Sequence, residues 1–460
     1  MINLLKRKSN KDKDLVALID GEHYPQVTRD AISELKRIYK GNFKGIIFLG
    51  GTEKLSIKNI EGFFGDRVYM ISNIDTDFKK ALAYFKPDIA YDLSDEPVVN
   101  YINRMKIASY CLASKCSYMG PDFLFSYEEK NIHCKKPTLS IIGTGKRIGK
   151  TAISSYVSKI FTDEGINVCV IAMGRGGPRE PQVIRGDRID ITSEYLLDIN
   201  SRGMHASSDY IEDALTSRVT TVGCRRCGGG FGGKIFMSNV KEGIKIAEKL
   251  NPDLVIVEGS GASIPDVETD SCICVISAAQ SWESIVGYLG IYRIISANLI
   301  ILTQCEEPAA DGDKINFLED RVREINPCAP IIKTIFRPQP LADIRGKRIF
   351  MAMTASTDIE QKIKEYMENN FKCRIQKISF NLSNREKLKM DLEKNRDYET
   401  ILTELKAASV DILTDYAHKN KKEVVYMNNA PVILEGEDIL KKELKKLFQK
   451  EKKNNGSKYK

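Results

Sequence analysis

The chain has 460 residues, of which 42% are hydrophobic and 29% charged, and its formal net charge is +8. This length exceeds one compact core, so we expect two or three folded domains rather than a disordered protein. No signal segment opens the sequence and no run of eighteen apolar residues occurs in it, so we expect a cytoplasmic protein that is neither secreted nor membrane-spanning.

The first region, residues 1–136, alternates short apolar runs with helical patterns. Three apolar runs and one helical pattern cover 15–19, 45–49, 68–71 and 29–39. This alternation predicts a small α/β domain with a parallel sheet. A polar, Pro-containing stretch at 131–137 interrupts both patterns and predicts a linker, so the expected domains are 1–136, 137–345 and 346–460.

Three polar residues follow the first strand, in the sequence IDGEHYP. Asp20, Glu22 and His23 lie where loops of parallel sheets carry active-site groups, and their chemistry suits metal binding or proton transfer. Asp-Gly also forms a tight turn by itself, so a structural role is an equal alternative. His23 is a candidate substrate ligand.

The stretch 138–152, TLSIIGTGKRIGKTA, is an apolar strand that enters a Gly-rich loop and then a helix. Small glycines let backbone N–H groups surround phosphate oxygens, while Lys150 adds a positive charge and the Thr151 hydroxyl suits Mg²⁺. The start of the following helix favours the same anion. We therefore predict a phosphate-binding loop. The candidate nucleotide-binding residues are Gly143, Thr144, Gly145, Lys146, Arg147, Ile148, Gly149, Lys150 and Thr151.

Further apolar runs in the middle region extend the predicted sheet. They cover 168–172, 254–257, 272–277 and 299–302. Continuous apolar runs are typical of parallel strands buried on both faces. We therefore predict an α/β fold, with a mostly parallel phosphate-loop sheet flanked by smaller N- and C-terminal α/β regions.

The loop after 168–172, MGRGGPREPQVIRGDRID, concentrates arginines. Phosphate-loop proteins commonly place an acidic metal ligand and basic residues here, so Asp187 is the predicted carboxylate, with Asp190 in reserve. The guanidinium group binds phosphate bidentately, which favours a catalytic or substrate-binding role over the alternative of a solvated basic loop. The catalytic candidates are Lys150, Arg175, Arg179 and Asp187, and the substrate-binding candidates are Arg185 and Arg188.

A second Gly-rich stretch, TVGCRRCGGGFGGK at 221–234, combines a flexible backbone with positive charge and predicts another anion site. Its candidate substrate-binding residues are Arg225, Arg226, Gly229, Gly230 and Lys234. Cys224 and Cys227 form one CxxC pair, which is half of a zinc site, so metal binding there is left open.

The strand at 254–257 delivers Glu258 to its carboxyl end, ahead of Gly259 and Gly261. A carboxylate at this edge could hold Mg²⁺ opposite the Thr151 hydroxyl. The alternative is a Glu that only caps a loop.

The last region begins with a predicted strand at 348–354, continues with helices around 358–369 and 399–408, and ends in a basic helix. Much of the net positive charge lies in the two ends of the chain, where charged runs are usually solvated. No nucleic-acid-binding pattern accompanies it, so we expect small anionic substrates instead. Eleven irregularly spaced cysteines indicate reduced thiols.

The loop GTGKRIGKT with VEGSG downstream resembles the dethiobiotin synthetase and cobyrinate amidase group of phosphate-loop proteins. That resemblance implies that Mg²⁺ is held by Thr151, Asp187 and Glu258. Residues 19 to about 350 resemble a narrower family, the cyclic 2,3-diphosphoglycerate synthetases of methanogenic archaea. The resemblance is carried by IDGEHYP, GTGKRIGKT, MGRGGPREP, CRRCGGGFGG, VEGSGASIP and FRPQPLADIRGKRIF.

The narrower resemblance implies that ATP and 2,3-bisphosphoglycerate are converted to a cyclic phosphoanhydride, ADP and phosphate, with Mg²⁺ as cofactor. Related folds often place the site near a two-fold interface, so a homodimer is expected. Two other functions stay open: a carboxylate-activating ligase of the dethiobiotin synthetase type, and a nucleotide-gated switch or metallochaperone. The guanine-specifying NKxD motif is absent, since 298–307 reads NLIILTQCEE.

Overall fold

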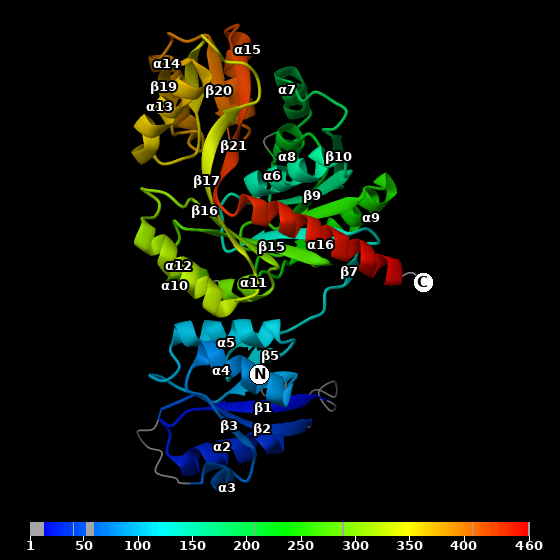
Figure 1. Cartoon of the computed structure of the whole chain (residues 1–460), viewed down its shortest axis with the longest axis vertical. Helices are drawn as coiled ribbons and strands as arrows, with labels where there is room; N and C mark the ends of the chain where they lie inside the picture. The colour runs from blue at the N-terminus through cyan, green and yellow to red at the C-terminus, as the bar shows by residue number, and fades with distance from the viewer. Residues whose placement is uncertain are drawn as a thin grey trace. The chain divides into compact units, whose positions relative to one another are not determined.

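The computed structural model describes residues 13–39, 41–51, 59–206, 208–287, 289–406 and 408–458. The chain divides into two compact units (Figure 1). The first comprises Met1–Glu129, Gln280–Ser296 and Leu318–Cys328, and the second comprises Lys130–Ala279, Ala297–Phe317 and Ala329–Lys460. Two segments from the middle of the chain thus belong with the N-terminal region, which the predicted division into three consecutive domains did not anticipate.

The first unit is built on a six-stranded sheet in the order β3-β2-β1-β4-β5-β6, parallel except for the β5–β6 pair. Its elements are β1 (Asp14–Ile19), α2 (Pro25–Ile38), β2 (Asn42–Phe48), α3 (Ile60–Phe64), β3 (Val68–Met70), α4 (Ile74–Phe85), β4 (Ile89–Asp92), α5 (Tyr101–Ala113), β5 (Ser117–Met119), β6 (Leu124–Phe125), α10 (Trp282–Gly287) and α11 (Gly290–Ile295). The helices α10 and α11 pack against α5. The predicted parallel α/β sheet is therefore present.

The second unit contains the phosphate-loop strand and most of the sheet. Its elements from β7 to β17, in chain order, are β7 (Ile132–His133), β8 (Thr138–Gly143), α6 (Lys150–Asp163), β9 (Val168–Gly174), β10 (Gln182–Arg185), α7 (Ser193–Ser201), α8 (Asp209–Ser217), β11 (Thr220–Cys227), β12 (Met237–Ser238), α9 (Val240–Leu250), β13 (Leu254–Glu258), β14 (Val267–Glu268), β15 (Ser271–Ser277), β16 (Leu299–Thr303) and β17 (Ile331–Pro340). The helix α12 (Gly312–Ile325) begins in this unit and ends in the first.

The C-terminal part of the second unit adds further strands to the same sheet, together with their helices. These elements are β18 (Arg348–Ala352), η2 (Thr357–Ile359), α13 (Glu360–Phe371), β19 (Arg374–Ser379), α14 (Arg385–Lys394), β20 (Thr400–Glu404), η3 (Ser409–Thr414), α15 (Asp415–Lys419), β21 (Glu423–Glu435) and α16 (Glu437–Lys458). No helix in the described ranges is long and apolar enough to cross a bilayer.

One sheet of thirteen strands runs through the second unit, in the order β10-β11-β9-β13-β8-β15-β16-β17-β21-β20-β18-β19, with β12 on β11. The strands from β11 to β17 are parallel to one another, and so are the strands from β21 to β19. The two sets meet where β17 pairs antiparallel with β21, so they run in opposite directions.

The β17–β21 pair also separates the two parallel sets along the strand direction. Only residues 331–333 of β17 pair with β16, and only residues 423–427 of β21 pair with β20, while the two long strands pair with each other from Lys333 to Pro340. Figure 1 shows β17 and β21 passing from one part of the unit to the other. Because the sets run in opposite directions, their carboxyl ends face each other along this ribbon.

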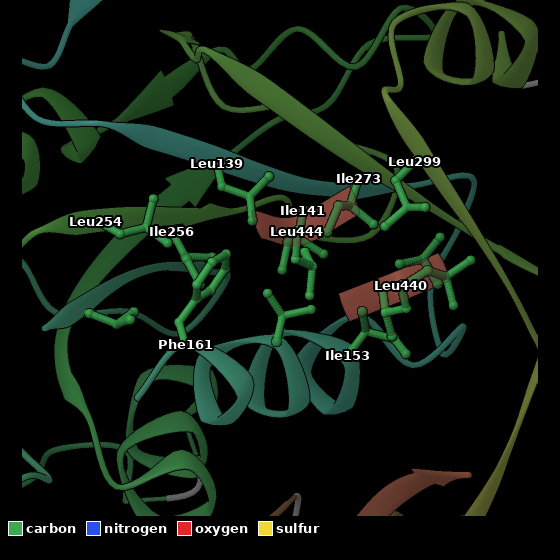
Figure 2. Packing of buried hydrophobic residues seen from close by; sticks show 14 of the residues in the cluster. Leu139, Ile141, Ile153, Phe161, Leu254, Ile256, Ile273, Leu299, Leu440 and Leu444 are labelled. Carbon is green, nitrogen blue, oxygen red and sulfur yellow. The ribbon is translucent and has the colours of Figure 1, made fainter. Parts of the chain in front are cut away.

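The core of the phosphate-loop part is formed by strands buried on both faces and covered by α6 and α16. All residues of β8 and β9 are buried, as their continuous apolar runs predicted. Figure 2 shows Leu440 and Leu444 of α16 packed in one cluster with Ile141 and Ile273 of the central strands. The predicted basic C-terminal helix is thus amphipathic, with its apolar face completing this core.

The prediction of a helix at 399–408 is wrong. Residues Thr400–Glu404 form the strand β20, which pairs in parallel with β18 and β21 and is buried along its whole length. Apolar residues at Ile401, Leu402 and Leu405 fit a helical period, but a short run buried on both faces looks the same in sequence, and the position between two strands decides the conformation.

Candidate functional site

A cavity of about 820 Å³ lies between the facing carboxyl ends of the two parallel sets. One wall contains the loop after β8 and the ends of β9 and β13. The opposite wall, which we call the C-terminal wall, contains the segments 353–366, 383–385 and 404–411 that follow β18, β19 and β20. Ligands of open α/β sheets bind outside the carboxyl ends of the strands, and here two such edges share one cavity.

The phosphate loop lines the cavity from Lys146 to Thr151 and has the tight backbone that the sequence predicts. Gly149 has a φ of +90°, and a Cβ on it would lie 2.1 Å from Cζ of Phe336. A Cβ on Gly143 would lie 2.4 Å from Cδ1 of Ile148. Both positions therefore require glycine, which leaves backbone N–H groups exposed to a bound anion.

Lys150 and Thr151 begin α6 and face the cavity. Lys150 is buried, and its Nζ donates a hydrogen bond to the carbonyl oxygen of Gly145 at 2.7 Å. This contact holds the amine over the loop, where phosphate oxygens would bind. The N-terminal end of the fourteen-residue helix α6 adds a partial positive charge at the same point.

A cluster of buried carboxyl groups lies next to the loop. Glu258 ends β13, and within the described residues its Oε1 has no hydrogen-bond partner; the same holds for both carboxyl oxygens of Asp213 in α8. Burial, and then the charges of Asp209 and Glu212, raise the pKa of Glu258. Burial, and then the charge of Glu258, raise the pKa of Asp213. Uncompensated carboxyl groups of this kind favour a bound cation.

Two arginines lie side by side at the loop after β13. Nη2 of Arg175 lies 3.2 Å, and Nη2 of Arg226 3.6 Å, from the point that a Cβ on Gly261 would occupy. Arg226 is 8% exposed and donates to the carbonyl oxygen of Ser260 at 2.8 Å, while its Nε is buried with no hydrogen-bond partner in the described part of the chain. Burial and the charge of Arg175 lower the pKa of Arg226. Two adjacent guanidinium groups form a site for an anion.

The structure does not bring Asp187 to this cavity. Its Oδ2 lies 2.8 Å from Nη2 of Arg185, and its Oδ1 accepts a hydrogen bond from Thr220 at 2.7 Å. The Arg185 hydrogen bond lowers the pKa of Asp187 to about 2. The segment leaves the site because β10 pairs antiparallel at the outer edge of the sheet. Asp187 therefore lies outside the cavity lining, whereas Asp209 lies in it.

Several other candidate residues also lie outside the cavity lining. They are Gly143, Thr144, Gly145, Arg179, Arg185, Arg188, Arg225, Arg226, Gly229, Gly230, Lys234 and His23. The Gly-rich stretch after β11 turns back through β12, which pairs with the end of β11. His23 lies in the first unit, with Nδ1 3.0 Å from Oδ1 of Asp20, which also accepts from the backbone of Glu22. That geometry supports the turn-forming alternative for IDGEHYP.

The CxxC pair has no support as a metal site. Burial raises the pKa of the Cys224 thiol to about 12, which disfavours the thiolate that a metal requires, while Cys227 is exposed. Among the residues that the structure describes, no three His, Cys, Asp or Glu side chains converge to hold an ion.

Sequence reasoning missed Asp209 and the C-terminal wall. Asp209 begins α8, far along the chain from the end of β9, and in sequence it looks like an ordinary acidic first-turn residue. On the wall, Arg385 and Lys406 follow short strands with no recognisable motif. Only the position of each residue at a sheet edge marks it, and that position requires the strand order.

A parallel sheet with a Gly-Lys-Thr loop at its carboxyl edge and a buried glutamate on the neighbouring strand defines a phosphate-loop nucleotide-binding protein. Comparison with known families identifies the particular family within this class. The chain matches the cyclic 2,3-diphosphoglycerate synthetase N-terminal domain over 14–126, the phosphate-loop domain over 138–335 and the C-terminal domain over 340–430. The chain belongs to the cyclic 2,3-diphosphoglycerate synthetase family, and it is therefore an enzyme.

Full-length relatives agree with this assignment. The cyclic 2,3-diphosphoglycerate synthetase of Methanothermus fervidus is 44% identical over 92% of this chain and 94% of its own length. The enzymes of the same name from Methanothermobacter thermautotrophicus and Rubrobacter xylanophilus are each 43% identical, over 92% and 90% of this chain and 93% of their own lengths. Among solved structures, LpxK from Aquifex aeolicus is 15% identical with a TM-score of 0.42, over 70% of this chain and 91% of its own, too distant to carry an argument.

Proposed function

We propose that the protein uses ATP to close 2,3-bisphosphoglycerate into its cyclic phosphoanhydride, releasing ADP and phosphate. The observation that carries this proposal is the family match across all three domains together with relatives of that name over more than nine-tenths of the chain. The cavity supports it, because the phosphate loop, Arg175 and Gly261 line one space, and Arg226 lies next to Arg175 at Gly261.

ATP would bind with its β- and γ-phosphates in the loop from Gly143 to Thr151. The backbone N–H groups and the start of α6 would hold the phosphate oxygens, and the amine of Lys150 would lie between the β- and γ-phosphates. The amine now donates to a neutral acceptor, the Gly145 carbonyl oxygen. A charged phosphate oxygen is a stronger acceptor and can replace it.

Mg²⁺ would be held by Thr151, Glu258 and Asp209, with Asp209 taking the role that the sequence suggested for Asp187. The donor set fits, because Mg²⁺ prefers oxygen ligands and the buried Glu258 offers an oxygen, Oε1, that no other described residue hydrogen-bonds. Phosphate oxygens and water would complete the shell, as is usual for this ion. When bound, Mg²⁺ supplies charge neutralisation at the β- and γ-phosphates.

Arg175 and Arg226 would hold the substrate phosphate that receives the γ-phosphoryl group. An oxygen of that phosphate attacks the γ-phosphorus, the bond to ADP breaks, and a linear anhydride forms. An oxygen of the second substrate phosphate then attacks the first, a ring anhydride bond forms, and inorganic phosphate leaves. Both steps join like-charged groups, so positive charge and fixed geometry are what the residues contribute.

The test is ³¹P NMR of the protein with Mg·ATP and 2,3-bisphosphoglycerate. We expect new anhydride signals that grow in step with ADP and phosphate, and their loss in Lys150→Ala with the fold intact. Lys159→Ala, on an exposed turn of the same helix, is the matched control and should retain activity. ADP formation without anhydride signals would refute the proposal. The cytoplasmic location and the homodimer stay predictions.

A further inference from the structure

We propose that the C-terminal wall is a second anion site, in which Lys406 and Arg385 bind 2,3-bisphosphoglycerate opposite the phosphate loop. The inference rests on the proposed function and adds to it the half of the site that the substrate needs. It starts from the strand directions, because β18, β19 and β20 point their carboxyl ends at the cavity that the phosphate loop lines.

Lys406 reaches from the C-terminal wall to the phosphate-loop part of the unit. Its Nζ lies 2.9 Å from Oε1 of Glu212 in α8, and its side chain is still 37% exposed and lines the cavity. The charge of Glu212 raises the pKa of Lys406 against the effect of burial, so the amine stays protonated. One carboxylate engages one of the three N–H donors, which leaves others for a ligand.

Arg385 is the first residue of α14 and lines the same wall. It pairs with Asp411, and its side chain is 57% exposed. Close before Arg385 and close after Lys406, the chain is joined by a hydrogen bond from the N–H of Ala408 to the carbonyl oxygen of Leu382 at 3.3 Å. The two cations therefore belong to one connected surface, and a guanidinium and an ammonium group together suit a phosphate.

A buried carboxylate, Glu404, holds together the strand ends that form the wall. Glu404 is buried at the end of β20, and its carboxylate accepts hydrogen bonds from the Thr354 N–H at 3.2 Å and hydroxyl at 2.8 Å and from the Asn429 amide. These contacts connect β18, β20 and β21 at their cavity ends. Glu404 is thus engaged in structure, which leaves Lys406 and Arg385 to meet a ligand.

The position of Lys406 distinguishes the substrate side from the nucleotide side. Glu212 follows Asp209 by one turn of α8, so Lys406 lies on the side of the proposed metal ligands. A different lysine of the wall, Lys362, pairs with Glu306 after β16, on the other side of the phosphate loop. The substrate that accepts the γ-phosphoryl group must lie on the side of Asp209 and Glu258, which is the side of Lys406.

Charge gives the physical reason for a second site. Two phosphates and a carboxylate carry about −4 to −5 at pH 7. Arg175 and Arg226 lie beside Gly261, in the loop that follows Glu258, and would hold the phosphate that reacts first. Ring closure then brings the second phosphate onto the first, and Lys406 and Arg385 on the opposite wall would hold that second phosphate and lower the repulsion between the two.

The experiment measures equilibrium binding by calorimetry, with 2,3-bisphosphoglycerate and with the Mg²⁺ complex of a nonhydrolysable ATP analogue as separate probes. We expect Lys406→Met and Arg385→Gln each to weaken bisphosphoglycerate binding by about tenfold to a hundredfold, the cost of one charged hydrogen bond. The ATP analogue should bind within about twofold of the wild type. Lys389→Met, an exposed residue on α14 beyond Arg385, should change neither.

Glu212→Gln separates ligand binding from a structural role of the ion pair. If Lys406 only held α8, Glu212→Gln and Lys406→Met would act alike; we expect Glu212→Gln to keep bisphosphoglycerate affinity and Lys406→Arg to restore most of it. The inference would be overturned if both wall variants bound bisphosphoglycerate as the wild type does, or if they lost as much affinity for the ATP analogue as for bisphosphoglycerate. Neither outcome would affect catalysis by the wild type. A wild-type enzyme that neither binds nor consumes bisphosphoglycerate would instead refute the proposed function.

Discussion

Asp209 and Asp187 show how the chemistry of a single residue depends on where its backbone goes. Both are aspartates in polar segments after β9, but Asp209 lines the cavity beside Glu258, whereas Asp187 is bound by Arg185 and Thr220 at the sheet edge. A carboxylate engaged by a guanidinium and a hydroxyl has little capacity left for a metal. We therefore expect replacement of Asp209 to affect Mg²⁺-dependent turnover and replacement of Asp187 to leave it nearly unchanged.

Asp209→Asn is expected to reduce Mg²⁺-dependent turnover by about ten- to a hundredfold, because a charged ligand to the ion becomes neutral. The Mg²⁺ concentration for half-maximal rate should rise with it. Asp187→Asn is the matched control and should keep the rate within about threefold. The measurement is the initial rate at several Mg²⁺ concentrations. A selective loss in the Asp187 variant would restore the original assignment.

Asp187 should instead contribute to stability, in a pH-dependent way. Its pKa is about 2 in the folded state and 3.8 ordinarily, so its contribution is present above pH 4 and is lost as pH falls through 2. The shift corresponds to about 1 kcal/mol after discounting for its partly exposed side chain. Urea unfolding of Asp187→Asn should show this deficit at pH 6 and less of it at pH 3. The exposed Asp190→Asn should show none; a pH-independent deficit at Asp187 would contradict the argument.

At the scale of elements, the sequence predicts what periodicity and motif encode and misses what pairing decides. The strand, Gly-rich turn and helix of the phosphate loop were predictable because each residue type there has a local backbone reason, such as the positive φ of Gly149. β20 was taken for a helix because only its place between β18 and β21 makes it a strand. Asp209 was missed because it reaches the cavity only through the packing of α8 on β9 and β11.

The helix α16 is rich in charged residues, but its apolar side chains belong to the core. Leu440, Leu444 and Phe448 belong to the core under the phosphate-loop strands, with the Phe448 ring 5.8 Å from that of Phe161. Leu444→Ala should therefore lower the free energy of unfolding by about 2–5 kcal/mol, as for other buried leucines. Lys446→Ala, on the exposed face of the same helix, should cost less than about 0.5 kcal/mol. Denaturant unfolding measures both, and equal values would mean that α16 only rests on the surface.

At the scale of the whole molecule, contacts rather than chain order define the units. The sequence placed a boundary at a polar linker near 131–137, yet the first unit also takes in Gln280–Ser296 and Leu318–Cys328. The polar composition of a linker predicts one crossing between units. No local sequence pattern predicts that later helices pack with an earlier sheet. The returning segments make specific contacts: α10 and α11 pack on α5, and Nζ of Lys79 donates to the carbonyl oxygen of Ile325 at 2.8 Å.

A fragment ending at residue 129 should consequently be less stable than the same residues in the full chain. It lacks α10, α11 and the end of α12, so the face of α5 that α10 and α11 cover becomes exposed to water. Burial of apolar surface stabilises by about 25 cal/mol per Å², so losing this cover should lower the urea midpoint and create binding of a hydrophobic dye. Hydrogen exchange of α5 in the full chain, followed by mass spectrometry, supplies the reference. Equal protection of α5 in the fragment and in the full chain would show that the N-terminal sheet is independent of its returning helices.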